Sequence, residues 1–255
     1  MKIVKTHTLT QQQKIEIQSL TKACQDRWNM SLSFPFEDGT SFYLLYENFL
    51  VSTLALIMPE RAPKTAAADE FGTAECIAFT LPSEQNKGYF TALLEAAEEE
   101  IQDINLLFTT DESNEGALKT LCALDAELNG RELRMELSPA FADRSALTPR
   151  LTITSVRDEA NASLAFHLTS SPHTEIGKSN AAFFQKSACL YGFEIEEEYR
   201  NQGFGKEALL LFIDYIKSQG CSLLYLHVSD DNVPALRLYE KTGFRVTETL
   251  SYYLY

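Results

Sequence analysis

Residues 200–206 form a segment that could bind a phosphate group. The segment reads Arg-Asn-Gln-Gly-Phe-Gly-Lys, with two glycines and a basic residue at each end. Glycine lets the backbone come close to a ligand. A helix that begins at such a loop directs unpaired N–H groups and the positive end of its dipole toward the loop. Together these features suit a pyrophosphate. A tight turn that needs glycine for its own geometry is the alternative interpretation.

A dinucleotide-binding fingerprint is a second interpretation of the same loop. Residues 203–208 fit the pattern GxGxxA, and Asp230 follows at about the distance that this pattern requires. However, seven residues, 196–202, separate the first glycine from the preceding predicted strand, and only one further short helix follows. A doubly wound sheet could not be completed from so short a remainder. A nicotinamide-dependent enzyme is therefore the less favoured hypothesis.

A second informative segment, 232–244, reads Asn-Val-Pro-Ala-Leu-Arg-Leu-Tyr-Glu-Lys-Thr-Gly-Phe. Proline at its start and glycine after its end are typical of a short helix. Together with the loop at 200–206, it resembles the GNAT superfamily of acetyl-CoA-dependent N-acetyltransferases. That family has an R/Q-x-x-G-x-G/A loop after its fourth strand and an N-x-x-A-x-x-L-Y-x-x-x-G-F helix after its fifth. The matching residues are Arg200, Gly203, Gly205, Asn232, Ala235, Leu238, Tyr239, Gly243 and Phe244.

The resemblance implies which residues bind acetyl-CoA. In the family, backbone amides of the loop hold the pyrophosphate, the pantetheine arm runs along the backbone of the fourth strand, and the asparagine bonds the pantetheine. The strict match covers about residues 185–255. The residues that the motifs assign to the cofactor are Phe193, Ile195, Arg200, Gln202, Gly203, Phe204, Gly205, Lys206, Asn232 and Ala235.

The resemblance also implies a catalytic acid, Tyr239, which would protonate the leaving thiolate. A tyrosine pKa near 10 keeps a proton available at neutral pH. An aromatic side chain of the core is the alternative role. The base is open: Glu194 and Glu196 alternate along the strand with Phe193 and should face away from it, and His227 could also reach the cleft. For the two glutamates, a solvated acidic strand end is an equally good interpretation.

A weak internal repeat extends the resemblance to the first half of the chain. The spacing from Gln85 to Gly88 in the first copy equals that from Arg200 to Gly203 in the second. An asparagine comes 26 residues after the glycine in the first copy (114 − 88) and 29 residues after it in the second (232 − 203). In the first copy Phe90 replaces the second loop glycine, and Leu121 replaces the tyrosine. We therefore expect that the first copy has lost cofactor binding.

The resemblance, extended by the repeat, implies two tandem GNAT-like domains, 1–140 and 150–255. It implies that each is an α/β domain of the α+β type, with a mixed, mostly antiparallel sheet flanked by helices, and the hydrophobic pattern agrees with such elements. A proline-containing segment at 138–149 is the predicted linker. Helices are expected at 10–28, 88–101, 114–128, 204–218 and 234–242. Strands are expected at 1–4, 42–46, 49–58, 74–81, 105–109, 151–156, 163–168, 188–195, 222–228 and 246–255.

Charge and composition limit the partners. The chain has 36 acidic and 22 basic residues, a net charge of −14, which disfavours nucleic acid and anionic membranes. It has no apolar run long enough to span a bilayer, and its N-terminus lacks the apolar core of a signal peptide, so we expect a cytoplasmic protein. Five scattered cysteines show no metal-binding spacing, so no metal is expected.

The sequence thus predicts an N-acetyltransferase that moves an acetyl group from acetyl-CoA to an amine of a small molecule or peptide. The acidic composition is compatible with a cationic acceptor. Two alternatives stay open: a catalytically silent acyl-CoA sensor, and an acyltransferase with a longer acyl donor or a non-amine acceptor.

Overall fold

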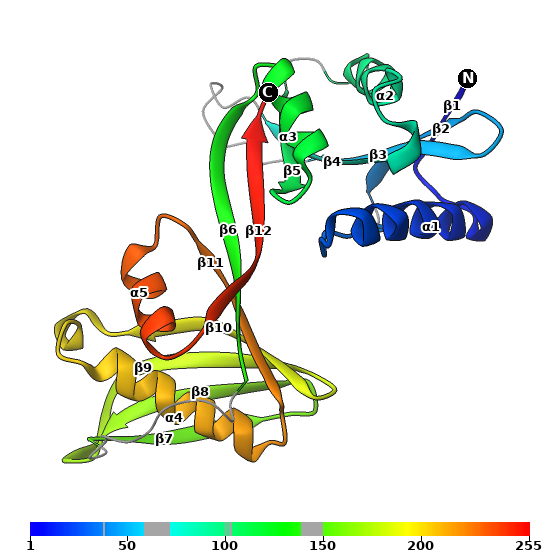
Figure 1. The fold of residues 1–255 in the computed structure, drawn as a ribbon. Coiled ribbons are helices and arrows are strands. Elements are labelled where there is room, and N and C mark those ends of the chain that lie inside the picture. Colours follow the sequence, from blue (N-terminus) through cyan, green and yellow to red (C-terminus); the bar gives the residue numbers. More distant parts are fainter. Residues whose placement is uncertain (38, 59–71, 100, 102–103, 139–149) are drawn as a thin grey trace. The chain divides into compact units, whose positions relative to one another are not determined.

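The structure is a computed structural model, and it describes residues 1–37, 39–58, 72–99, 101, 104–138 and 150–255 (Figure 1). The chain forms two compact units. The first unit is Met1–Arg131 with Leu250–Tyr255, and the second unit is Glu132–Thr249. The domain bounds predicted from the sequence, 1–140 and 150–255, remain a prediction. All of the predicted linker except Ser138 lies outside the described residues.

The first unit is a mixed sheet with helices on both faces. Its strand order is β1 (Lys2–Thr6), β2 (Thr40–Tyr46), β3 (Leu50–Ile57), β4 (Thr73–Thr80), β5 (Asn105–Asp111) and the end of β12 (Arg245–Leu254). Only the β4–β5 pair is parallel among these described strands.

Separate apolar clusters hold the helices of the first unit to its sheet. Helix α1 (Gln11–Trp28) packs against one face of the sheet through Ile17 and Leu20. Helices α2 (Tyr89–Glu98) and α3 (Glu115–Ala123) pack on the other, through residues such as Leu93 and Leu121 (Figure 1). A short 3₁₀ turn, η1 (Pro82–Glu84), precedes α2.

The second unit repeats this order with one difference. Its strands are β6 (Glu127–Leu137, of which Glu132–Leu137 belong here), β11 (Leu223–Ser229), β10 (Ser187–Ile195), β9 (Ser171–Phe184), β8 (Asn161–Leu168) and β7 (Leu151–Arg157). Only β10 and β11 are parallel among these strands. Residues 158–160 connect β7 to β8 directly, whereas a helix joins the first two strands of the first unit.

One apolar core holds the helices of the second unit to its sheet. Helix α4 (Phe204–Ser218) covers one face of the sheet (Figure 1) and buries Phe212, Ile213 and Ile216 completely. Helix α5 (Val233–Lys241) contributes Tyr239 to the same core, and the short turn η3 (Glu197–Tyr199) precedes α4.

The predicted fold class, mixed and mostly antiparallel sheets flanked by helices, is confirmed. Two strands were not foreseen: β6, and β9, which runs from Ser171 to Phe184. Strand β6 is rich in Glu, Arg and Leu, which favour helices, so the alternation of apolar Leu133, Met135 and Leu137 with polar residues was the only signal of a strand. Helix α3 is shorter than predicted, because Asp125 takes a left-handed conformation (φ 56°) just after it.

Gly177 of β9 offers a test of the packing in the second unit. A Cβ added there would lie 2.4 Å from the carbonyl oxygen of Glu194 and 2.8 Å from Cδ1 of Ile195. Because the clash is with backbone, we expect Gly177→Ala to lower the free energy of unfolding by about 1–3 kcal/mol in urea denaturation. Gly130→Ala is the control, since a Cβ there meets nothing within 4 Å. Equal losses for the two variants would contradict the packing.

Candidate active site

The site begins where β10 and β11 part. These parallel strands pair from Ser187 with Leu223 to Leu190 with Leu226. Strand β10 then runs on to Ile195 and β11 to Ser229, and no further pairing joins them in the described residues. Backbone N–H and C=O groups on the facing edges of the two strands therefore need partners other than each other.

A bulge in β10 lies in the unpaired stretch. The register of β10 against β9 shifts between Tyr191 and Glu194, and Gly192 within it has a positive φ of 59°. A bulge twists the strand and redirects its backbone groups. Gly192 was not among the predicted site residues. A lone glycine inside a strand pattern was the available signal.

The loop after β10 presents the start of α4. Asn201 (φ 60°) and Gly203 (φ 85°) both take left-handed conformations. Gly203 is the N-cap of α4, and no side chain caps that end of the helix. Phe204, Gly205 and Lys206 thus form the first turn, where backbone N–H groups have no intrahelical acceptor. This end of the helix can receive an anion.

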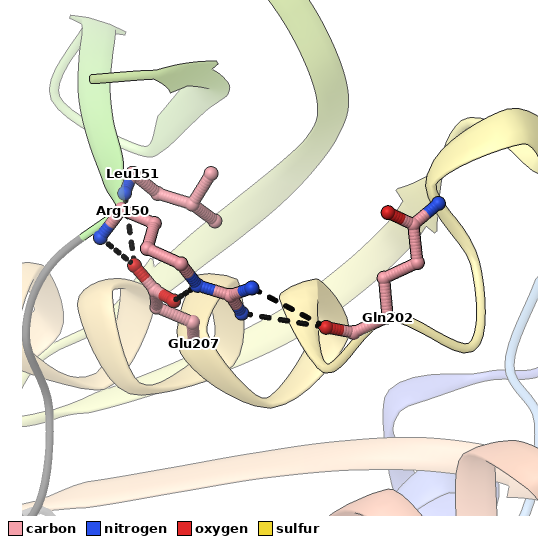
Figure 2. A network of polar contacts seen from close by, with 4 residues as sticks. All are labelled: Arg150, Leu151, Gln202 and Glu207. Carbon is pink, nitrogen blue, oxygen red and sulfur yellow. Dashed lines mark hydrogen bonds and ion pairs between the residues drawn. The ribbon is translucent and has the colours of Figure 1, made fainter. Parts of the chain in front are cut away.

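A buried carboxylate fixes the loop to strand β7 (Figure 2). Glu207, in the first turn of α4, is only 3 % exposed. Its carboxylate accepts hydrogen bonds from the backbone N–H groups of Arg150 and of Leu151 (2.8 Å), and from Nε of Arg150 (3.0 Å). The charge of Arg150 compensates the buried charge of Glu207, and a carboxylate also suits the positive end of the helix dipole.

The guanidinium of Arg150 reaches onward to the loop. Both terminal nitrogens lie 3.4 Å from the carbonyl oxygen of Gln202, and the guanidinium carbon lies 4.3 Å from the centre of the Phe204 ring. Figure 2 shows these contacts in line, from Glu207 through Arg150 to Gln202. Sequence reasoning missed both Arg150 and Glu207. The signal for Glu207 was an acidic residue on the same helical face as Phe204.

Other predicted loop residues tie the loop to the end of β10. Nε of Arg200 donates to the carbonyl of Ile195 (2.7 Å), and the side-chain amide of Gln202 donates to the carbonyl of Glu198 (2.7 Å). Lys206 is exposed. Arg200 therefore supports the loop through its Nε, and the side chains of both Arg200 and Lys206 are exposed.

Helix α5 carries Asn232 and the predicted acid. Asn232 is the N-cap, and its side-chain oxygen accepts from the N–H of Ala235 (3.3 Å), which leaves the amide nitrogen of Asn232 as a donor. Tyr239 is 8 % exposed and packs against Phe244, with ring centres 5.7 Å apart. Burial raises the pKa of the Tyr239 phenol above its ordinary value, so the group keeps its proton to higher pH.

The candidate bases lie toward the other face of the sheet from the α4–α5 core. Ile195 is buried and Glu194 is exposed, with its oxygens 3.6 Å from Nζ of Lys178 and 3.7 Å from Nη2 of Arg200. Glu196 is exposed at the start of η3. Nδ1 of His227, on β11, lies 3.1 Å from Oε1 of Glu132.

The strand residues predicted to hold the cofactor pack toward the core. Phe193 is half-buried against it, with its ring 6.0 Å from that of Phe166, and Ile195 is 8 % exposed. The side chain of Ile195 is therefore directed away from a ligand, and its backbone groups are the ones that can serve it. Ala235 packs against the same core. In the described part of the chain no cluster of His, Cys, Asp and Glu has a metal-binding arrangement, and no helix is long and apolar enough to cross a membrane.

Comparison with known proteins identifies the kind of domain. Residues 155–244 match the model of the acetyltransferase (GNAT) family. The chain is similar to the uncharacterized N-acetyltransferase YycN of Bacillus subtilis, with 39 % identity over 66 residues, which are 26 % of this chain and 42 % of that protein. The match thus spans less than half of that relative.

Two solved structures share the fold over nearly the whole chain. A GCN5-related N-acetyltransferase from Sphaerobacter thermophilus has a TM-score of 0.75 at 12 % identity, and the match covers 99 % of this chain and 95 % of that one. A tandem GNAT protein from the clavulanic acid biosynthesis pathway has a TM-score of 0.69 at 12 % identity, with coverage of 100 % and 98 %. The tandem arrangement of the fold is therefore shared with known proteins.

The Glu207 carboxylate gives a second testable prediction. Glu207→Gln removes the buried negative charge and places an N–H₂ group against N–H donors, so we expect it to lower the free energy of unfolding by about 1–3 kcal/mol. Chemical denaturation of the full chain measures this. Glu240→Gln, at an exposed position of α5, is the matched control and should change stability by less than about 0.5 kcal/mol. If the two variants are equally stable, the carboxylate does not hold the loop.

Proposed function

We propose that the GNAT acetyltransferase domain of this chain transfers an acetyl group from acetyl-CoA to an amine. The observation that carries the proposal is the uncapped N-terminus of α4 at Gly203, in the loop that follows β10 after this strand has left β11. Backbone N–H groups there suit the pyrophosphate, and the free edge of β10 suits the amide-containing arm.

Direct transfer is the mechanism that these groups support. The amine nitrogen attacks the thioester carbonyl, and a backbone N–H of the bulged stretch of β10 polarises the carbonyl oxygen. Tyr239 donates its proton to the sulfur as the C–S bond breaks. A cationic acceptor first loses a proton to Glu194 or Glu196, directly or through water, because only the neutral amine has a lone pair for the attack. The second proton, which the nitrogen loses as the amide forms, returns through water to the Tyr239 phenolate. Tyr239 comes from the α5 side of the sheet and Glu194 from the other, so a substrate between the parted strands could be reached from both.

The acceptor is proposed to be a cationic amine of a small molecule or peptide. The net charge of −14 favours such a molecule over a polyanion. No helix lies between β7 and β8 in the chain. The face of the sheet that bears Glu194 therefore has no counterpart of α1, the helix that joins the first two strands of the first unit. A screen of amine classes with acetyl-CoA tests the proposal, with turnover measured as release of the free thiol of CoA. Absence of turnover together with absence of CoA binding would refute it.

Tyr239→Phe tests the assigned acid. The phenyl ring preserves the packing against Phe244 but removes the proton, so we expect kcat to fall by about 10²-fold while KM for acetyl-CoA changes little. Because burial raises the pKa of Tyr239, wild-type kcat should show no loss from this group until the pH exceeds the ordinary tyrosine pKa. An unchanged kcat would favour a different acid, whereas a wild-type protein that binds acetyl-CoA without turnover would favour the acyl-CoA sensor.

Glu194→Gln and Glu196→Gln separate the two candidate bases. The variant that removes the base should lower kcat/KM by about 10²-fold, because no side chain then accepts the amine proton. The other variant should keep the wild-type value. His227→Gln is the third arm, since His227 with Glu132 is the remaining candidate. If all three variants keep the wild-type value, the proton leaves to solvent.

A further inference from the structure

Strand β7 lies at one end of the sheet of the second unit and has an open backbone edge (Figure 1). In the part of the chain that the structure describes, β8 is the one strand that pairs with it. This pairing keeps a continuous register, without a bulge, over all seven residues of β7. The other edge of β7 is therefore regular over the same length, and its backbone groups need partners outside the sheet.

The hydrogen bonds at the two ends of the β7–β8 pair show which residues face the open edge. The carbonyl of Arg150 accepts from the N–H of Thr169 (2.7 Å), and the N–H of Asp158 donates to the carbonyl of Asn161 (3.0 Å). In an antiparallel pair, residues that bond to the neighbouring strand alternate with residues that do not. The even-numbered residues of β7 therefore bond to β8, and the backbone groups of the odd-numbered residues point outward.

The first of these outward groups is already engaged within the chain. The N–H of Leu151 donates to the buried carboxylate of Glu207 (2.8 Å). The next outward residues are Ile153, Ser155 and Arg157, and no other strand among the described residues lies beside them. Outward groups on every second residue have the spacing that an added strand requires.

The side chains of β7 do not protect this edge. Exposed edge strands commonly carry lysine, proline or a bulge, which prevent pairing with another chain. Strand β1, the edge of the first unit, follows this rule, with Lys2 and Lys5 among its five residues. Residues 151–156 of β7 are uncharged and contain no proline, and Arg157 turns toward the ring of Phe183, with its guanidinium carbon 4.2 Å from the ring centre.

Charge indicates which partner suits this edge. The chain carries a net charge of −14, so two copies repel one another over most of their surfaces. An edge without acidic residues is a place where two copies can meet without that repulsion. The edge is also suited to itself, because antiparallel pairing of two identical strands places the same groups on both sides.

An exposed apolar side chain lies on the same strand. Val156 is 79 % exposed, the largest value among the large hydrophobic residues of the described chain. Thr152 and Thr154 are exposed on the same face of the strand, since alternate residues share a face. All three side chains are β-branched, and such side chains pack well across neighbouring strands. A strand added at this edge would cover Val156.

We propose that β7 pairs with β7 of a second copy of this chain, antiparallel and about a two-fold axis at Ser155. In this register Ser155 faces Ser155 of the second copy, and Ile153 faces its Arg157, so the outward backbone groups of all three residues are bonded. Val156 then faces Thr154 of the second copy in a pair whose side chains approach closely. The interface is the same patch on both copies, so the assembly closes as a dimer.

Light scattering during size-exclusion chromatography of the full chain tests the dimer. We expect the wild type to have twice the mass of one chain and Ser155→Lys to have the mass of one, because two like charges would face each other at the axis. Val246→Lys is the matched control, since Val246 is an exposed residue of β12 (46 %), and it should stay dimeric. A wild type that is a monomer over a concentration series would overturn the proposal, as would a dimeric Ser155→Lys.

Ser155→Pro tests the backbone part of the interface. Proline removes the outward N–H of residue 155 without removing a hydrogen bond to β8, so the sheet can keep its own pairing. We expect a folded monomer, with the circular dichroism spectrum of the wild type. A folded Ser155→Pro variant that remains a dimer would show that the edge of β7 is not paired.

Cross-linking tests the register independently of any loss of stability. Residues opposite each other in a hydrogen-bonded pair have Cα atoms about 5.5 Å apart, a distance that a disulfide spans. In a Cys122→Ser background, which removes an exposed thiol, Ser155→Cys should give a covalent dimer on mild oxidation with diamide. Thr152→Cys is the control, because its two copies would lie about 20 Å apart. A dimeric protein in which Ser155→Cys does not cross-link, or cross-links no better than Thr152→Cys, would overturn the proposed register.

Discussion

In each unit two parallel strands separate after four paired residues, and the structure of the unit depends on how the backbone groups beyond that point are satisfied. Past that point every backbone N–H and C=O on the facing edges must find another partner. The chain meets this requirement by following the strand with a turn and an uncapped helix, so that unpaired donors gather at one place. A protein interior tolerates such a place only if water or a ligand completes it. The topology thus leaves unpaired backbone donors at the start of a helix beside a free strand edge.

The loop keeps its shape because charged groups outside the binding surface hold it. Glu207 is buried, and three donors from Arg150 and Leu151 surround its carboxylate. Arg150 in turn packs over Phe204 and touches the carbonyl of Gln202. The first turn of α4 is therefore attached to the first strand of its own sheet. This attachment organises the loop before a ligand arrives, which reduces the ordering that binding must accomplish.

The sequence was sufficient for the parts of the molecule that local chemistry determines. The glycine loop at 200–206 and the asparagine-capped helix at 232–244 follow two successive strands, as their motifs predicted, and the structure shows that these strands are parallel neighbours. Long-range contacts were not predictable in the same way. Arg150 and Glu207 are 57 residues apart, and neither belongs to a motif. The bulge at Gly192 depends on the register of β10 against β9, a strand that sequence reasoning did not foresee.

Leu250–Leu254, near the end of the chain, complete the sheet of the first unit, where they pair with Leu107–Asp111 of β5. During synthesis, β5 leaves the ribosome long before its partner does. Until then β5 exposes a strand edge that can pair wrongly with other chains. The first unit thus reaches its final form only after residues 250–254 have been made, and a nascent chain interrupted within the second unit would carry an open sheet edge.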